Sequence, residues 1–187
     1  MAPKTRIEAL EKEPYTGKNP KKAAVMALFY AGPENLTYLL FILRKQYEGV
    51  HSNQIGFPGG RMEKGDSSLL ETAIRESREE VGIDPGQVSV IRSISELYIP
   101  PSNFLVTPYL GLYNKTQPFV AQESEVETLI EVPLTEIMDE QVLTTRKLAT
   151  SYAREIEVPA FELGGHIVWG ATAMMLSEIK ELFKMLI

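Results

Sequence analysis

The chain has 187 residues, of which 44% are hydrophobic and 24% are charged, a mixture typical of one folded domain rather than of a disordered chain. It has no cysteine, which excludes disulfides, thiolate zinc sites, iron–sulfur clusters and cysteine nucleophiles. Its formal net charge of -6 argues against broad binding to nucleic acid, because that affinity comes mainly from basic residues at phosphates. A small anionic substrate would therefore need metal ions to supply positive charge locally.

The first 13 residues mix basic and acidic side chains with few apolar ones, so they lack the hydrophobic region of a secretory signal. Nowhere does an apolar run approach the ~20 residues of a membrane-spanning helix. We therefore expect a cytoplasmic protein with no membrane partner. We also expect residues 1–20 to be an N-terminal extension and residues 21–187 to form a single domain.

Two apolar segments near the start, 23–30 and 36–43, are rich in residues that favour strands. The stretch 32–35 between them begins with Gly32 and Pro33, which are typical of a turn. The sequence therefore predicts a β-hairpin that leads into a sheet.

The stretch 68–81 has apolar or small residues at spacings of three and four, the pattern of one buried face of an amphipathic helix. These residues are Leu70, Ala73, Ile74, Ser77 and Val81. Ser68 and Glu71 have the spacing of a capping box, in which two side chains close unpaired N–H groups of the first turn. Gly82 stands where a left-handed residue commonly ends a helix. We therefore expect a helix over 68–81.

The rest of the chain alternates between the two kinds of element. Further strands are expected at 88–97, 105–113 and 127–132. A turn or exposed loop is expected at 100–103, and Pro133 is a suitable start for a short helix. The stretch 171–186 returns to helical spacing. Strands with helices between them predict an α/β layered domain.

Three glutamates share the polar face of the central helix, at positions i, i+3 and i+4: Glu76, Glu79 and Glu80. At an effective dielectric constant of ~20 and separations of ~5 to 6 Å, each pair would repel by about 3 kcal/mol. Arg75 precedes Glu79 by four residues and can brace it, but one arginine cannot neutralise three carboxylates. Hard oxygen ligands without His or Cys suit Mg²⁺ or Mn²⁺, which commonly bridge carboxylates to substrate phosphates.

A helix rich in Arg and Glu is more often only a solvated face, and this alternative applies here as well. The residues before the helix favour a site instead. The stretch 56–61 contains Gly59 and Gly60, whose missing side chains let the backbone approach a ligand closely, and ends at Arg61. We expect this loop and the carboxylates to converge, and the sequence therefore predicts metal-dependent chemistry on a phosphate.

Gly60, Asp66 and the run 75–83 together resemble the signature of the Nudix family of hydrolases, in which a glycine and an acidic residue precede R-E-x-x-E-E-x-G. The chain departs from this signature in three places. The spacing from Gly60 to Arg75 is one residue longer than the common form, Asp66 replaces the usual glutamate, and Ser77 replaces an aliphatic residue.

The resemblance implies the Nudix fold, an α/β/α sandwich with a mixed β-sheet, with this helix on one face and the C-terminal helix in the other layer. It also implies that Glu76, Glu79 and Glu80 hold one or more Mg²⁺ or Mn²⁺ ions, with the Gly60 carbonyl as a further ligand. Such ions neutralise pyrophosphate oxygens and position the attacking water. Water attack would yield two phosphomonoesters.

Within the family, the chain is similar to the coenzyme A pyrophosphatase branch, which has the longer spacing. The segment 43–60 resembles the stretch that this branch carries before the signature. Glu125 with Val126, and the segment 167–173, resemble its later landmarks, so the resemblance covers most of residues 20–187. It implies hydrolysis of coenzyme A or acyl-coenzyme A to 3′,5′-ADP and 4′-phosphopantetheine.

Departures from the branch bear on the substrate. The branch has threonine, serine or alanine, arginine and glycine where this chain has Ile42, Lys45, Gly49 and Asn53. The 3′-phosphate of coenzyme A needs cationic partners, and each candidate is equally an ordinary surface charge. The candidates for substrate contact are Arg44, Lys45, Arg61 and His51, together with the backbone at Gly59 and Gly60.

The general base is expected among the carboxylates, because Nudix enzymes take it from the signature or from a later loop. Glu76 and Glu125 are the candidates. The alternative for Glu125 is that it is a solvated charge within the acidic stretch 123–125.

Two other functions remain open. A Nudix hydrolase acting on ADP-ribose, a dinucleotide polyphosphate or a damaged nucleotide would use the same metal chemistry with a different pocket. A non-catalytic Nudix module would keep the fold and bind a nucleotide as a sensor, and the presence of all three helix glutamates favours an enzyme over it. In each case the expected partner is a small-molecule nucleotide, bound by a monomer or a homodimer.

Overall fold

The computed structural model describes residues 19–46, 53–150 and 153–185. Within these residues, the largest element is a mixed sheet of eight strands, whose main path runs β3-β2-β1-β7-β5. β4 pairs with β1, β6 with β7 and β8 with β2. The strands are β1 (Lys21–Ala31), β2 (Thr37–Arg44), β3 (Ile55–Gly56), β4 (Gly59–Arg61), β5 (Val88–Ser93), β6 (Leu97–Ile99), β7 (Phe104–Tyr113) and β8 (Val126–Pro133).

A second sheet in the described part of the chain has three strands in the order β11-β10-β9. They are β9 (Leu143–Thr150), β10 (Ala153–Leu163) and β11 (His166–Trp169). The α-helices are α2 (Leu69–Val81), α3 (Leu134–Met138) and α4 (Gly170–Lys184). Short 3₁₀ turns at 33–35, 85–87, 100–102 and 140–142 lie in the connections between these elements.

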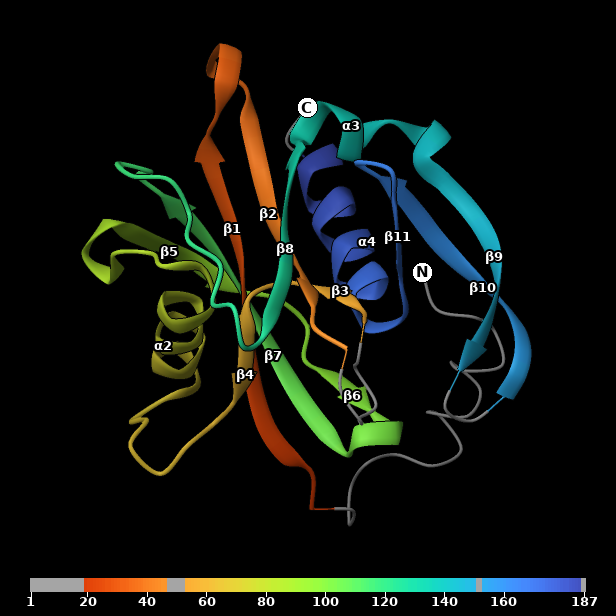
Figure 1. The fold of residues 1–187 in the computed structure, drawn as a ribbon, viewed down its shortest axis with the longest axis horizontal. Helices are drawn as coiled ribbons and strands as arrows, with labels where there is room; N and C mark the ends of the chain where they lie inside the picture. Colours follow the sequence, from red (N-terminus) through yellow and green to blue (C-terminus); the bar gives the residue numbers. More distant parts are fainter. Residues whose placement is uncertain (1–18, 47–52, 151–152, 186–187) are drawn as a thin grey trace.

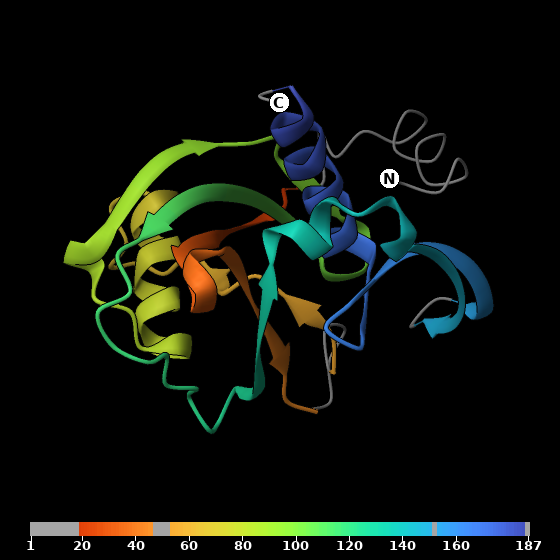
Figure 2. The same cartoon turned by 90° about the horizontal axis from the view of Figure 1, so that it is seen from above.

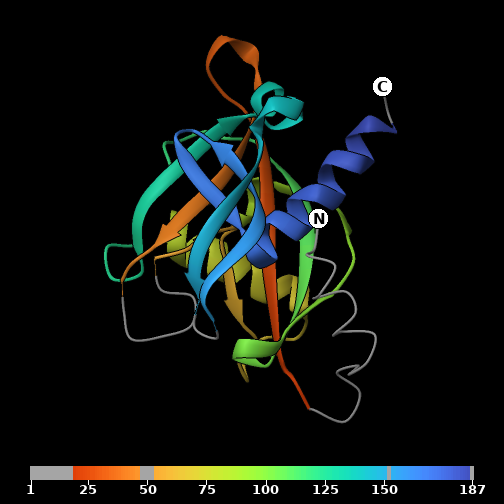
Figure 3. The same cartoon turned by 90° about the vertical axis from the view of Figure 1, so that its right-hand side faces the viewer.

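The elements form layers around the large sheet. Figure 1 shows α2 on one side of this sheet and α4 on the other, with the second sheet beyond α4. Seen from above in Figure 2, α2 and the β9–β10 hairpin lie toward opposite ends of the molecule. In Figure 3 the same hairpin crosses the face turned to the viewer. The expected α/β/α sandwich with a mixed sheet is therefore confirmed, and the second sheet adds to it.

β1 is the central strand of the large sheet, parallel to β7 and antiparallel to β2. Because side chains alternate along a strand, β1 serves two cores. Ala24, Met26 and Leu28 pack in the cluster that includes Ala73 of α2, whereas Phe29 packs in the cluster that includes residues of α4. Burial on both faces explains the nearly unbroken apolar run in this part of the sequence.

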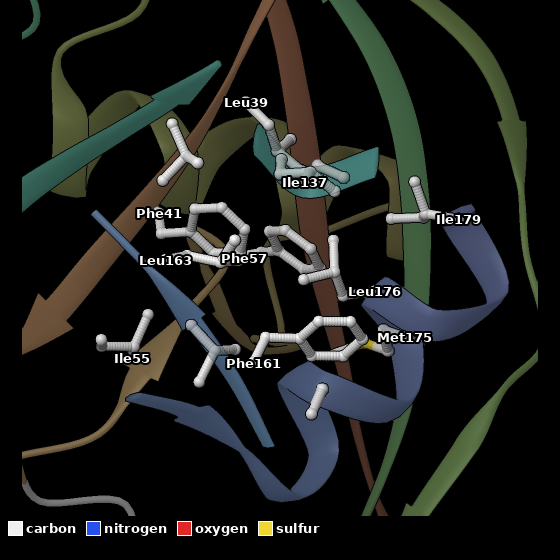
Figure 4. Close-up of a cluster of buried hydrophobic side chains, with 14 of the residues drawn as sticks. Leu39, Phe41, Ile55, Phe57, Ile137, Phe161, Leu163, Met175, Leu176 and Ile179 are labelled. Carbon is white, nitrogen blue, oxygen red and sulfur yellow. The ribbon is translucent and has the colours of Figure 1, made fainter. Parts of the chain in front are cut away.

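The second of these cores is rich in aromatic rings. Figure 4 shows Phe41, Phe57 and Phe161 between the large sheet and α4, close to Met175 and Leu176 of that helix. The rings of Phe41 and Phe57 stack with centroids 5.0 Å apart. Phe57 is 1% exposed, and its burial fixes the position of the chain immediately before the glycine pair.

Helix α2 begins and ends where the sequence predicts. The Ser68 hydroxyl accepts a hydrogen bond from the Glu71 backbone N–H at 3.1 Å, and Gly82 ends the helix with a left-handed φ of 70°. The capping box differs in one respect. The Glu71 carboxylate accepts from the backbone N–H and hydroxyl of Ser67 rather than from Ser68, so the reciprocal bond forms one residue earlier.

The strand expected over 88–97 is instead two strands, β5 and β6, and this prediction was wrong. Both pair with β7, but Pro108 of β7 has no N–H to donate to the ladder between them. Its carbonyl accepts from the Ile94 backbone N–H at 3.0 Å, and residues 94–96 separate the two strands. The boundary proposed at residue 20 stays a prediction, because residues 1–18 lie outside the described part of the chain.

Candidate active site

The three glutamates of α2 differ in their environment. The side chain of Glu80 is 1% exposed and that of Glu76 is 13% exposed, whereas that of Glu79 is 56% exposed. Glu79 Oε2 accepts from Arg75 Nη1 at 2.9 Å, the brace that the spacing of four residues predicts. The structure therefore brings Glu76 and Glu80 inward and leaves Glu79 at the rim.

Glu80 of α2 is held by groups from two strands of the large sheet. Arg44 Nη1 donates to Glu80 Oε1 at 2.9 Å, and the Gly59 N–H donates to Glu80 Oε2 at 2.7 Å. Arg44 Nη2 also donates to the Gly59 carbonyl at 2.5 Å. These three contacts form a closed ring through the end of β2, the start of β4 and the last turn of α2.

Burial raises the pKa of Glu80 to about 7, since the charged carboxylate is removed from water. Arg44 and the Gly59 N–H oppose this effect, and the charges of Glu76 and Glu125 add to it. Burial also raises the pKa of Glu76, which Arg75 partly offsets. Carboxyl groups with raised pKa values are common in sites that bind cations or transfer protons.

Gly60 of β4 lies directly against Glu76. A Cβ atom at this position would be 2.5 Å from Glu76 Cδ, closer than real contacts allow. β4 brings Gly60 there by pairing with β1, where Gly60 is opposite Ala24. The predicted convergence of the glycine loop and the helix carboxylates is therefore present in the structure.

Asp66 and Arg75 join the loop after β4 to the helix. Asp66 Oδ1 accepts from Arg75 Nε at 2.9 Å, and Asp66 Oδ2 accepts from Arg75 Nη2, Thr72 Oγ1 and the Glu63 N–H. Arg75 lowers the pKa of Asp66 well below its usual range, and Asp66 raises the pKa of Arg75. The donors to this aspartate all come from the loop and α2, so Asp66 links the loop to the helix.

Glu125 lies at the same site although it is far from α2 in the sequence. It immediately precedes β8, and its carbonyl accepts from the Lys45 N–H at 2.9 Å. Its charge raises the pKa of both Glu76 and Glu80, and its side chain is exposed. The loop that carries it is attached to the end of α2, where the Gln122 N–H donates to the Glu80 carbonyl and the Val120 N–H to the Val81 carbonyl.

The other residues expected at the substrate are distributed around this centre. Lys45 follows Arg44 directly and is half-buried, while Arg61 ends β4 and is exposed. Arg61 contributes its carbonyl to Arg75 Nη2 at 3.2 Å. His51 lies outside the described residues.

The donors facing the site are of the kind that a divalent hard cation binds. They are carboxylate oxygens on α2, next to a backbone position without a side chain at Gly60. Within the described residues, no three His, Asp or Glu side chains are grouped closely enough to hold a metal ion as they are placed. Arg44 and the Gly59 N–H engage both oxygens of Glu80.

Two contacts of the site were not predicted from the sequence. The first is the pairing of Arg44 with Glu80, although the alternation of Leu40, Ile42 and Arg44 on the side of β2 that faces α2 is a signal for it. The second is the attachment of the 114–125 loop. Lys115 Nζ lies 4.5 Å and 4.4 Å from the ring centroids of Tyr30 and Phe119 and 2.7 Å from Glu131 Oε2.

Comparison with solved structures supports the fold. The Nudix hydrolase RenU from M. smegmatis superposes with a TM-score of 0.61 at 15% identity, covering 89% of this chain and 87% of that one. The NUDIX domain of Shewanella oneidensis NrtR, solved with ADP ribose, has a TM-score of 0.57 at 15% identity, covering 97% and 99%. No α-helix in the described ranges is long and apolar enough to cross a membrane.

Sequence comparison adds the family. Residues 20–153 match the NUDIX domain. The protein from Pectobacterium atrosepticum named uncharacterized Nudix hydrolase NudL is 34% identical over 167 residues, covering 85% of this chain and 81% of its own length. Its namesake from Yersinia enterocolitica is 39% identical over 120 residues, covering 64% of this chain and 60% of that protein. The predicted resemblance is thereby confirmed at the level of the family, and the chain belongs to the Nudix hydrolases.

Proposed function

We propose that this protein is a Mg²⁺- or Mn²⁺-dependent pyrophosphohydrolase whose substrate is coenzyme A or acyl-coenzyme A, with 3′,5′-ADP and (acyl-)4′-phosphopantetheine as products. The observation that carries the proposal is the pair of inward carboxylates, Glu76 and Glu80, which face the glycine pair of β4 with Glu125 brought beside them. Such a set of hard oxygen donors around a close backbone approach suits a diphosphate and its cation.

Each of these residues has a defined part in the reaction. Glu76, Glu79, Glu80 and the Gly60 carbonyl would hold the divalent ions, which when bound neutralise the diphosphate and lower the pKa of the attacking water. Glu125, with its exposed carboxylate, accepts the proton of that water, and Glu76 is the alternative acceptor. The water oxygen bonds to one phosphorus as the bridging P–O bond breaks, which leaves two phosphomonoesters.

The substrate assignment depends on cations around the site. Arg44, Lys45 and Arg61 are within the segments that meet at the glycine pair, and we assign them, with His51, to the phosphates of coenzyme A. A nucleotide coenzyme and a chain without cysteine both suit a reducing compartment such as the cytoplasm. A monomer or a homodimer would serve this reaction.

ADP-ribose is the alternative substrate, because the NUDIX domain of NrtR was solved with that ligand. It differs from coenzyme A in lacking the 3′-phosphate and in having a ribose in place of the pantetheine group. A third possibility, nucleotide binding without catalysis, requires a site that no longer turns over substrate, whereas all three α2 glutamates are present here.

One substrate panel separates these functions. Coenzyme A, an acyl-coenzyme A, dephospho-coenzyme A, ADP-ribose and a diadenosine polyphosphate are each incubated with Mg²⁺ or Mn²⁺ and with wild type or Glu80→Gln. We expect coenzyme A to have the highest kcat/KM, at least about 10-fold above dephospho-coenzyme A, and Glu80→Gln to lose about 100-fold or more. Equal kcat/KM values for coenzyme A and dephospho-coenzyme A would reject the coenzyme A assignment. No hydrolysis of any substrate in the panel would reject the proposal that the protein is an enzyme.

A further inference from the structure

We propose that Arg44 is a resident cation of this site, which neutralises Glu80 until a divalent metal ion takes its place there and is then released toward a phosphate of the substrate. Arg44 thus competes with the metal for Glu80 and contacts the substrate once it is released. The inference rests on the proposed metal-dependent hydrolysis and adds an exchange step to it.

The geometry at Glu80 is the first argument. Arg44 Nη1 is 2.9 Å from Glu80 Oε1, and the Gly59 N–H occupies Oε2 at 2.7 Å. The carboxylate is 1% exposed, so solvent does not reach the remaining surface of these oxygens. A metal ion can therefore use the Oε1 side of Glu80 only by displacing the guanidinium.

The placement of Arg44 on the strand is the second argument. Arg44 is in phase with Leu40 and Ile42, which pack on the α2 side of β2. The register of β2 against β8 shifts between Leu43 and Arg44, an irregularity of the kind that re-aims a side chain at the end of a strand. The side chain of Arg44 is also 24% exposed, so part of it reaches solvent although its partner Glu80 is buried.

The charges of the site are the third argument. An arginine stays protonated at any working pH and forms planar, two-pronged contacts with carboxylates and phosphates alike. While it is bound to Glu80 and to the Gly59 carbonyl, the inner carboxylate is neutralised without metal. When a metal replaces it at Glu80, the released guanidinium needs another anion, and the diphosphate substrate is the anion that arrives with the metal. Metal and substrate should therefore strengthen each other's binding through Arg44.

The test measures Mn²⁺ binding to metal-free protein without substrate, by titration followed with electron paramagnetic resonance. It is repeated at several pH values up to about 8.5 and compared at the highest, because Arg44 lowers the pKa of Glu80 and its removal lets protons compete more strongly with Mn²⁺ there. Because Mn²⁺ no longer competes with a guanidinium, we expect Arg44→Met to bind it about 10-fold more tightly than wild type. We expect its kcat/KM for coenzyme A to fall about 10-fold or more, because the phosphate loses its arginine.

Tighter Mn²⁺ binding together with a lower kcat/KM distinguishes the exchange from a merely structural role of Arg44. Damage to the site would weaken both metal binding and turnover. The matched control is Arg78→Met, which removes the same charge from an exposed position on α2 and should leave Mn²⁺ affinity within about twofold. Arg44→Lys is the second variant, in case the methionine variant does not fold. Lysine keeps the positive charge but lacks the planar guanidinium, and we expect an intermediate gain in Mn²⁺ affinity of about threefold.

The outcomes separate this inference from the proposed function. If wild type binds Mn²⁺ and hydrolyses coenzyme A, but folded Arg44→Met and Arg44→Lys bind the ion no more tightly, the exchange is overturned and the proposed function stands. If wild type neither binds Mn²⁺ nor hydrolyses any diphosphate, the proposed function fails together with the exchange. Circular dichroism and a cooperative thermal transition establish folding of each variant.

Discussion

The carboxylate of Glu76 occupies the space in which a side chain at Gly60 would begin, so that a Cβ there would lie 2.5 Å from Glu76 Cδ and 2.6 Å from each oxygen. The obstruction is the end of a flexible side chain rather than backbone. A larger residue at position 60 is therefore expected to move Glu76 and to leave the fold in place.

Gly60→Ala should lower kcat/KM by about 100-fold, because a displacement of about 1 Å at a catalytic group has an effect of that size. The thermal midpoint should change little. Gly65→Ala is the matched control, since a Cβ at Gly65 meets nothing within 4 Å. Equal activity of Gly60→Ala and wild type would show that the contact with Glu76 does not position a group used in turnover.

Asp66→Asn should lower the thermal midpoint by about 5 °C, because the amide nitrogen would face donors that now point at carboxylate oxygens. The pKa of Asp66 is lowered in the folded protein, so its contribution to stability is present at neutral pH and is lost as the pH falls through that lowered value. The difference between variant and wild type should accordingly shrink in strong acid. Glu63→Gln, an exposed acidic residue of the same loop, controls for charge.

Glu80 should have the opposite effect on the pH dependence of stability. Its folded pKa of about 7 lies above its ordinary value of 4.5, so the folded state binds the proton more tightly than the unfolded state. The resulting stabilisation is complete below about pH 4.5 and is lost as the pH rises through 7, by roughly 3 kcal/mol at most. Urea unfolding of metal-free wild type between pH 5 and pH 8 should show this decline, and Glu80→Gln should show a smaller one. A steeper decline in the variant would contradict the assignment of the slope to Glu80.

Glu125→Gln should lower kcat by about 100-fold if this carboxylate accepts the proton of the attacking water. The thermal midpoint should stay within about 1 °C, because the side chain is exposed. Glu123→Gln, in the same loop, is the control and should turn over as wild type does. Near-normal turnover of Glu125→Gln would leave Glu76 as the general base.

Phe119→Ala should loosen the loop that carries Glu125. The ring of Phe119 lies 5.1 Å from that of Tyr30 and 5.6 Å from that of Tyr113, with Lys115 Nζ over its face. Its removal should cost about 2 kcal/mol of unfolding free energy. Hydrogen exchange of the Val120 and Gln122 amides, which bond to the last carbonyls of α2, should accelerate. Unchanged exchange at both amides would show that the rings do not hold the loop.

The parts of the fold that the sequence predicts are those with strong local signals. Helix α2 has a cap at Ser68, a regular apolar stripe and a glycine at its end, and each signal corresponds to an observed contact or dihedral angle. The second sheet has no comparable signal. β10 contains Pro159, which removes one backbone donor and argues against a strand, and much of β9 is polar. The antiparallel pairing of β9 with β10 stabilises these strands although their local sequence does not favour them.

The candidate site also has one part that the sequence predicts and one part that it does not. The relation of Gly60 to Glu76 follows from a pattern of closely spaced residues, and the glycine loop and α2 were expected to meet. The pairing of Arg44 with Glu80 depends on where β2 ends relative to α2, and the approach of Glu125 depends on the register of β8 against β2. Both contacts are set by tertiary structure, so the spacing of apolar residues within one helix or strand cannot reveal them.

The parallel pairing of β1 with β7 also has a consequence for synthesis on the ribosome. Lys21 is opposite Phe104, so one edge of the central strand stays open until β7 has left the exit tunnel. During that interval the nascent chain presents one unpaired edge of β1, which is a template for pairing with another chain. Slow translation between residues 82 and 104 would lengthen this exposure, and the yield of native protein should depend on chaperones that cover the strand.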